Sequence, residues 1–195
     1  ANALVVDGTM KNDAIGGNME FTLGAWTVNG ADSNGYSFVN NGNFKAVVSG
    51  NTLLAGGFNL ETMPVDNTFD LTTGQLVMSA NNLIVNKLNS FKLNVTGGDL
   101  TLDALVNQSG GMLVGVSAGG LISDYILNQG GTITVNAGTI GLVGDSTDNI
   151  QTAIETLAGT TTTLTAASAI SADAGVSNKG TLSIYSPKIT ASSVS

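Results

Sequence analysis

Apolar and polar residues alternate along most of the chain in short runs. Residues 44–48 and 91–95, for example, place an apolar side chain at every second position. Because successive side chains of a β-strand point to opposite faces, this period predicts strands with one buried face. Glycine and asparagine separate the runs, and Pro64 marks a corner or an edge because it cannot donate to a strand ladder. The pattern predicts an all-β protein of many short strands.

Residues 105–135 contain the same pattern twice. An aliphatic pair, an Asn-Gln turn, two glycines and a β-prone run occupy residues 105–114 and return at 126–135. Weaker copies contain Asn40, which precedes Asn107, and Asn178, which follows Asn128. Both separations are close to whole multiples of a period of roughly 20 to 25 residues, which is typical of solenoids. The sequence therefore predicts a parallel β-helix of about eight or nine coils.

Each coil is expected to have an apolar interior and neutral polar corners. Glycine and asparagine suit the corners because both tolerate positive φ, and asparagines stacked from coil to coil can form a hydrogen-bonded ladder. Leucine, isoleucine, valine and methionine are expected to point inward, with threonine, serine and asparagine outward. Trp26 is interpreted as a core or end-cap residue.

The chain is predicted to be one solenoid domain, residues 1–195, in four parts. Residues 1–37 form atypical N-terminal coils or a cap, and 38–145 form regular coils. Residues 146–175 form a helical and Thr/Ala-rich insertion, and 176–195 form the C-terminal coil. The expected short helix spans residues 148–158, with Asp148 as N-cap and Gly159 after its end. It would cover one face or contact a neighbouring subunit. Residues 160–174 are either a loosely ordered excursion or a thin strand.

Composition excludes several classes of function. The chain has no Cys, no His and no Arg, so histidine-based triads, thiolate nucleophiles and the usual zinc sites are excluded. Its net charge of −8 disfavours nucleic acid, which requires a basic surface. Residues 104–123 are uncharged, yet they contain too many polar residues and glycines for a membrane helix. No enzymatic activity, membrane insertion or resident cofactor is expected.

Acidic residues are the remaining candidates for a metal site. Asp145 and Asp148 could supply oxygen ligands to calcium, although solvated turns are the simpler interpretation. Some other solenoids bind calcium through an array of Gly-Gly-x-Gly-x-Asp repeats, and this array is absent from the sequence. Residues 160–163 are similar to the threonine-rich strands of flat ice-binding surfaces, but the Thr-x-Thr pattern is not expected to recur in register along the chain.

The coils resemble the filamentous-haemagglutinin type of bacterial exoprotein or adhesin. The resemblance rests on residues 40–42, on residues 128–130 with Ile133, and on residues 178–180 with Leu182; Asn107 and Gln108 fit with one residue inserted. It implies a right-handed parallel β-helix that is secreted and displayed at the bacterial cell surface. The secretion-domain features that such proteins have at their amino ends are not evident here, so the route of export is left open.

Two functions remain. In the first, copies stack end to end through open strand edges and build an extracellular filament or biofilm fibre, with Thr190, Ala191 and Val194 forming the C-terminal edge. In the second, the chain is a fragment of an adhesin that binds a host receptor or glycan along its side. The first predicts ordered fibres from the isolated chain, and the second predicts a saturable ligand.

Overall fold

The computed structural model describes residues 2–12, 17–40, 42–59, 67–79, 82–144 and 152–195. This part of the chain forms strands and turns, without a helix. The strands, in chain order, are β1 (Ala3–Val6), β2 (Met10–Asn12), β3 (Asn18–Leu23), β4 (Ala25–Val28), β5 (Tyr36–Asn40), β6 (Asn43–Leu54), β7 (Gly57–Asn59), β8 (Thr68–Met78), β9 (Leu83–Asn86), β10 (Ser90–Val95), β11 (Leu100–Asn107), β12 (Gly111–Val116), β13 (Leu121–Asn128), β14 (Thr132–Leu142), β15 (Ile154–Thr156), β16 (Thr161–Ala172), β17 (Val176–Asn178), β18 (Thr181–Tyr185) and β19 (Ile189–Ala191).

The strands wind into a parallel β-solenoid with three faces. Face A stacks β3, β10, β12, β18 and the first parts of β6, β8, β14 and β16. Face B stacks β1, β4, β19, the first parts of β11 and β13 and the second parts of β6, β8, β14 and β16. Face C stacks β2, β5, β7, β9, β15, β17 and the second parts of β11 and β13. The predicted fold class is confirmed.

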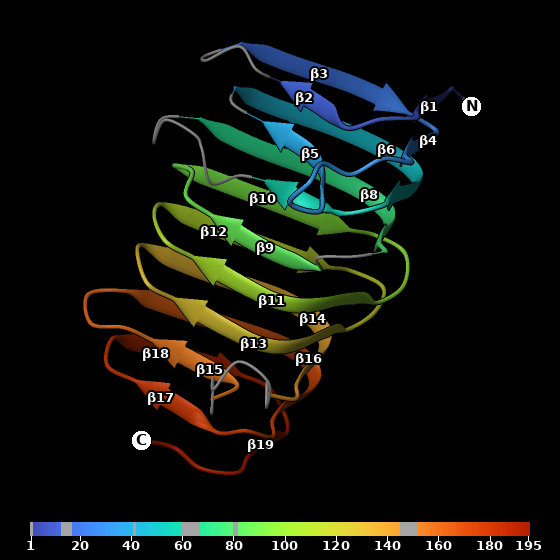
Figure 1. The fold of residues 1–195 in the computed structure, drawn as a ribbon. Helices are drawn as coiled ribbons and strands as arrows, with labels where there is room; N and C mark the ends of the chain where they lie inside the picture. The colour runs from blue at the N-terminus through green and yellow to red at the C-terminus, as the bar shows by residue number, and fades with distance from the viewer. Residues whose placement is uncertain (1, 13–16, 41, 60–66, 80–81, 145–151) are drawn as a thin grey trace.

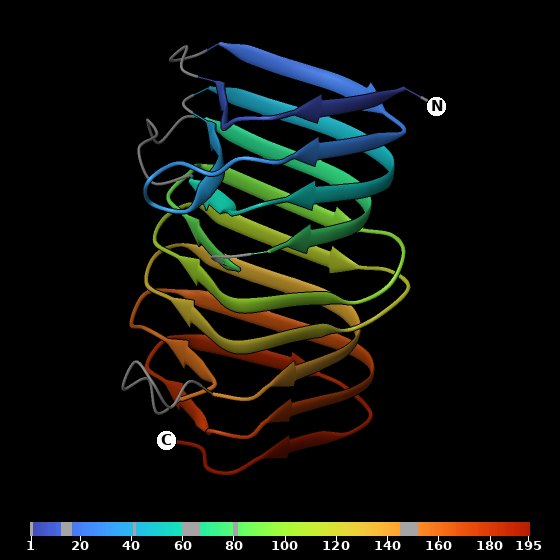
Figure 2. The same cartoon turned by 45° about the vertical axis from the view of Figure 1, so that its right-hand side comes forward.

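The coil is right-handed. In Figure 1 the nearer strands, such as β11 and β13, run toward the left while the strands behind them run toward the right, as the chain descends from its N-terminus. The view in Figure 2 shows the same descent, with the two termini at opposite ends of the stack.

The coil length follows from one inward-facing row on face A. Its members, one from each successive coil, are Met19, Phe44, Phe69, Phe91, Met112, Ile133, Thr162 and Leu182. Their numbering fits the predicted period of roughly 20 to 25 residues at every step except the longer one from Ile133 to Thr162. That coil contains residues 145–151, which lie outside the described part of the chain.

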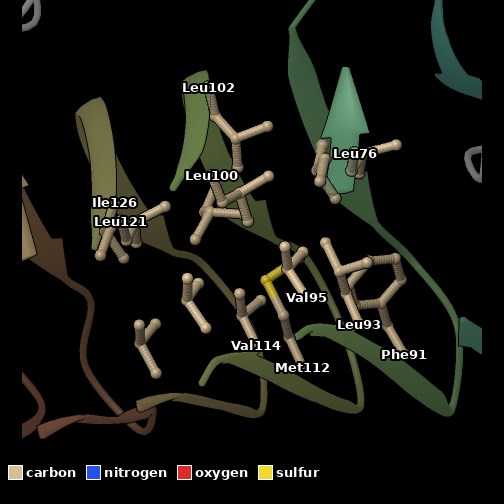
Figure 3. Packing of buried hydrophobic residues seen from close by; sticks show 14 of the residues in the cluster. Leu76, Phe91, Leu93, Val95, Leu100, Leu102, Met112, Val114, Leu121 and Ile126 are labelled. Carbon is tan, nitrogen blue, oxygen red and sulfur yellow. The ribbon is translucent and has the colours of Figure 1, made fainter. Parts of the chain in front are cut away.

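The interior is a continuous column of apolar side chains. Phe69 stacks on Phe44 and on Phe91, with ring centroids 5.0 Å apart in both pairs. Trp26 is fully buried and contacts Phe21, Phe38 and Phe44, so its interpretation as a core residue is confirmed. Further along, the inward side chains of β10, β11, β12 and β13 fill the space between the faces (Figure 3).

A ladder of buried polar residues runs along the corner that follows face C. Asn86, Asn107 and Asn128 are all fully buried and lie opposite one another in adjacent coils. Asn86 donates its Nδ2 to the Oδ1 of Asn107 at 2.7 Å. The row continues through the buried Thr156 to Asn178, which is exposed and lies two coils beyond Asn128. The predicted asparagine ladder is confirmed, and so is the interpretation that whole coils separate Asn128 from Asn178.

The predicted helix at 148–158 is wrong where the structure describes it. Residues 148–151 lie outside the described residues, but Ile154–Thr156 forms strand β15, which pairs in parallel with β13 and with β17. Ile154 and Thr156 are buried while Glu155 between them is not, so the period is two, as in a strand. Thr161–Ala172 is also a strand, β16, which pairs with β14 and β18, and not a loose excursion. Pairing with neighbouring coils overrides the local helical pattern.

Candidate self-association surface

The C-terminal end of the solenoid presents open strand edges. Strands β18 and β19 each pair with β16 on one side, and within the described residues no strand pairs with their other edge. Face C is completed there by residues 193–195, where Val194 forms a parallel bridge to Val176. The backbone groups on the outer side of this coil are therefore available to another strand.

The N-terminal end presents the opposite edges of the same three faces. In the described part of the chain, β1 pairs with β4 alone, β2 with β5 alone and β3 with β6 alone. All of these pairs are parallel. On each face, the first and the last described strand therefore run in the same direction and lie at opposite ends of the stack (Figures 1 and 2).

Both end coils have an incompletely covered apolar layer. Inward residues of inner coils, such as Phe44 and Leu71, are almost fully buried. The inward residues of the first and last described coils pack on the core but are only half-buried: Leu4, Val6, Met10, Met19, Phe21 and Leu23 in the first, and Leu182, Ile184 and Ala191 in the last. Within the described part of the chain no further coil packs against these two apolar layers.

The predicted edge residues all lie on the last coil. Thr190 and Ala191 belong to β19, where Thr190 is exposed and Ala191 points inward and is half-buried. Val194 forms the bridge to Val176 and is 75% exposed. Their role in self-association stays a prediction. Sequence reasoning missed Leu182 and Ile184 of β18 and the whole N-terminal layer, although their inward positions in the alternating pattern could have indicated them.

The outer surface of face A is charged near the N-terminus and uncharged toward the C-terminus. Near the N-terminus one outward row alternates in charge, as Glu20, Lys45, Asp70 and Lys92 lie opposite one another in successive coils. The Lys45 Nζ lies 2.8 Å from Glu20 Oε1, and the Lys92 Nζ lies 3.3 Å from Asp70 Oδ2. The hydrogen bond and the charge of Glu20 raise the pKa of Lys45 above its ordinary value, and Asp70 adds to this effect.

Toward the C-terminus the same face is uncharged and rich in hydroxyl groups. Thr132, Thr161 and Thr181 form one outward row, and a second row contains Thr134, Thr163 and Ser183. The Thr-x-Thr pattern recurs in register at 132–134 and 161–163 and continues as Thr-x-Ser at 181–183, so the expectation that it would not recur is wrong for these adjacent coils. Parallel pairing aligns the rows, which the unequal lengths of the intervening coils conceal in the sequence. Beside the rows lies a hollow of ≈ 390 Å³ bordered by Asn94, Gly115 and Asn136.

The predicted calcium residues, Asp145 and Asp148, lie outside the described residues. Among the residues that are described, no three Asp or Glu side chains gather as they would around a metal ion. Asp99 has a structural contact, because its Oδ1 accepts a hydrogen bond of 2.7 Å from the Gly120 backbone N–H in the next coil. Over the same residues, no helix has the length and apolar character needed to cross a membrane.

The β-solenoid is the feature that relates this chain to known architectures, and it is compatible with β-helix proteins that have structural or adhesive roles. Comparison at the level of the sequence and of the fold adds no relative: no protein-family model, no curated protein and no solved structure matches the chain.

Proposed function

We propose that this chain is a structural subunit of an extracellular bacterial surface filament, in which copies associate end to end through the edges of the solenoid. The observation that supports the proposal most is the pair of open ends, which expose edges of the same three parallel faces. Parallel edges at opposite ends of one molecule form a heterologous contact, and a heterologous contact that does not close produces a fibre.

The composition of the end layers supports the same function. The half-buried apolar residues at each end would be covered by those of the next copy, so the column of apolar side chains would continue through the junction. Few charges oppose the contact, since only 10% of the residues are charged.

Electron microscopy of the purified chain at neutral pH tests the proposal, and unbranched fibres of constant width are expected. Ile184→Lys places a charge in the end layer and should abolish the fibres, because the next copy would bury an unpaired ammonium group. Tyr185→Lys adds the same charge to the neighbouring residue of β18, which points outward and is 61% exposed, so its fibres should persist. Circular dichroism confirms that both variants are folded.

A chain that stays monomeric at every concentration would contradict the proposal. If Tyr185→Lys abolishes assembly and Ile184→Lys does not, the contact runs along the outside of the solenoid instead of through its ends.

A second function, that of an adhesin fragment binding a glycan along its side, is supported by the hydroxyl rows on β14, β16 and β18. Uncharged hydroxyl and amide groups in a regular array can exchange hydrogen bonds with sugar hydroxyls. A glycan array probed with the soluble chain tests this. Thr163→Leu, in the middle of the array, should weaken a saturable signal, whereas Thr101→Leu on face B should not. If the chain binds a protein receptor and no glycan, the proposal of a glycan ligand is wrong.

A further inference from the structure

The charged row on the outer surface of face A is complementary to itself. Its four members lie in successive coils and alternate in sign: Glu20, Lys45, Asp70 and Lys92. When the order of the row is reversed, a positive charge takes the place of each negative one and a negative charge the place of each positive one. A second copy turned end over end therefore presents an opposite charge to every member of the row.

The charged side chains are accessible to such a partner. They are between 36% and 66% exposed, although each forms an ion pair within the molecule. The rows on either side contain short, uncharged residues: Asn18, Asn43, Thr68 and Ser90 in one, and Thr22, Val47, Thr72 and Asn94 in the other. Because lysine and glutamate side chains are longer than these neighbours, a flat partner would meet the charged row first.

The charge of the whole chain makes this row unusual among its surfaces. The net charge is −8, so two copies that approach side by side repel each other. The charged row contains two positive and two negative residues and is neutral as a unit, and it holds two of the six lysines in the chain. It can therefore attract a second copy locally where the overall charge opposes contact.

We infer that two filaments associate side by side in antiparallel orientation, with their charged rows on face A in contact. This inference rests on the proposed filament and adds a lateral contact to it. The two copies are related by a two-fold axis that runs parallel to the strands, between the coils of Lys45 and Asp70. Such an axis reverses the order of the coils and keeps the strand direction, so each row of face A meets the same row of the other copy.

This arrangement pairs all four charges. Lys45 faces Asp70 of the other copy, and Glu20 faces Lys92 of the other copy. Because the contact is two-fold, each of these pairs occurs twice. Complementary charges of this kind determine the orientation and register of a contact more than its affinity.

Parallel filaments are less well matched. Without an axial shift, each member of the row would face the same residue of the other copy, and like charges would meet at all four positions. A shift of one coil produces three opposite pairs, but Lys92 then faces the uncharged Leu113, its neighbour in the next coil. The charges therefore favour the antiparallel arrangement.

The contact is small, which is why it requires a filament. Four coils with a spacing of about 4.8 Å and about five residues with a rise of about 3.3 Å correspond to roughly 300 Å² on each copy. A stable contact between two single molecules buries about 800 Å² per partner. Two identical filaments have the same axial repeat, so one matched pair of rows aligns the others, and the contacts act together.

Salt should separate the lateral contact from growth at the ends. The Debye length falls from about 10 Å at 0.1 M to about 3 Å at 1 M ionic strength, so salt screens the charged rows but not the apolar end layers. Electron micrographs of the native chain should show paired fibres at low ionic strength and single fibres in about 1 M sodium chloride.

Charge reversal at the centre of the row tests the contact directly. Lys45→Glu makes both central positions negative, and Asp70→Lys makes both positive, so each variant should form single fibres at low ionic strength. The two substitutions change the net charge of the chain in opposite directions. A loss of pairing in both variants would therefore not result from overall repulsion.

The double variant K45E/D70K is the matched control, because its net charge equals that of the native chain. Its row has two negative charges followed by two positive ones, which restores four opposite pairs in the antiparallel arrangement, so paired fibres should return. In the shifted parallel arrangement two of the three pairs would have like charges. Class averages of the pairs should show a two-fold axis perpendicular to the fibre, and circular dichroism confirms that each variant is folded.

The inference is supported if the native chain and K45E/D70K form salt-sensitive pairs while both single variants form single fibres. Native fibres that stay single at low ionic strength, pairs that persist in either single variant, or single fibres of K45E/D70K would overturn the lateral contact while the filament remains. If the native chain forms no fibres, both the filament and its lateral contact are wrong.

Discussion

The side chains of Asn107 and Asn128 lie side by side in adjacent coils, and the Nδ2 of Asn107 is 3.4 Å from the Oδ1 of Asn128. The same amide also donates to the carbonyl groups of Gly130 and, at 3.1 Å, of Thr132. Both asparagines are fully buried. One side chain thus satisfies backbone groups at the corner of the next coil, where the strand ladder is interrupted.

Removing Asn107 should therefore destabilise the solenoid. Asn107→Ala leaves the carbonyls of Gly130 and Thr132 without this donor and is expected to lower the free energy of unfolding by about 1–3 kcal/mol. Denaturant unfolding followed by circular dichroism measures the loss. Asn136, which is exposed on β14, is the control, and its change to alanine should have little effect. Equal effects at both positions would contradict a structural ladder.

Asn107→Asp should make stability depend on pH. The carboxyl would be buried beside carbonyl oxygens, so its pKa in the folded state should lie above that in the unfolded state. The folded state then binds the proton more tightly. Its stability is greatest below the unfolded pKa and falls as pH rises through the folded pKa. Unfolding curves between mildly acidic and neutral pH should show this decline, and Asn136→Asp should not.

The phenylalanine stack is expected to be a major contributor to stability. Phe69 is buried between Phe44 and Phe91, with its ring nearly parallel to that of Phe91 at an interplanar angle of 3°. Phe69→Ala should cost about 3–5 kcal/mol, because it removes contacts on both sides and leaves a cavity. Val47→Ala, on the outward side of β6, should change stability by less than about 0.5 kcal/mol. Thermal unfolding of the two variants compares them.

Glycines at the corners should differ in their tolerance of a side chain. Gly131 has a φ of 76°, and a Cβ there would collide with the Gly110 carbonyl of the preceding coil. Gly159 has a similar φ of 79° but open space around it, and Gly141 has neither constraint. Substitution by alanine should therefore be most destabilising at Gly131, intermediate at Gly159 and mildest at Gly141. A different order of melting temperatures would contradict this account.

The charged row on face A should be measurable by titration. Glu20→Gln removes the negative charge that raises the pKa of Lys45 and leaves only a neutral amide oxygen as hydrogen-bond acceptor, so the pKa should fall toward its ordinary value. A raised lysine pKa adds stability below the unfolded pKa, and this stability is lost as pH rises through the folded pKa, in the alkaline range. The ¹³Cε shift of Lys45 followed by NMR reports the change. Asp173→Asn, at the other end of the molecule, should leave it unaltered.

Much of the fold could be predicted because each repeat is a short pattern of residue types that can be recognised within one segment of the sequence. Residues 105–114 and 126–135 carry the same pattern one period apart, and the structure places Asn107 opposite Asn128 as that period requires. The helix predicted at 148–158 failed because residues 153, 154 and 157 have helical spacing, while Ile154 and Thr156 also suit a strand. Two neighbouring coils supply hydrogen bonds to β15, and no local pattern contains that information.

The sequence by itself determined the strand period, the length of most coils, the asparagine ladder and the exclusion of imidazole and thiol chemistry, because each depends on residue identity and local spacing. Only the tertiary structure decided which residues share a row, that the hydroxyl groups of three coils are aligned, and on which faces the described strands begin and end. These depend on corner lengths, which vary from coil to coil and become visible only when backbone hydrogen bonds bring neighbouring coils into register.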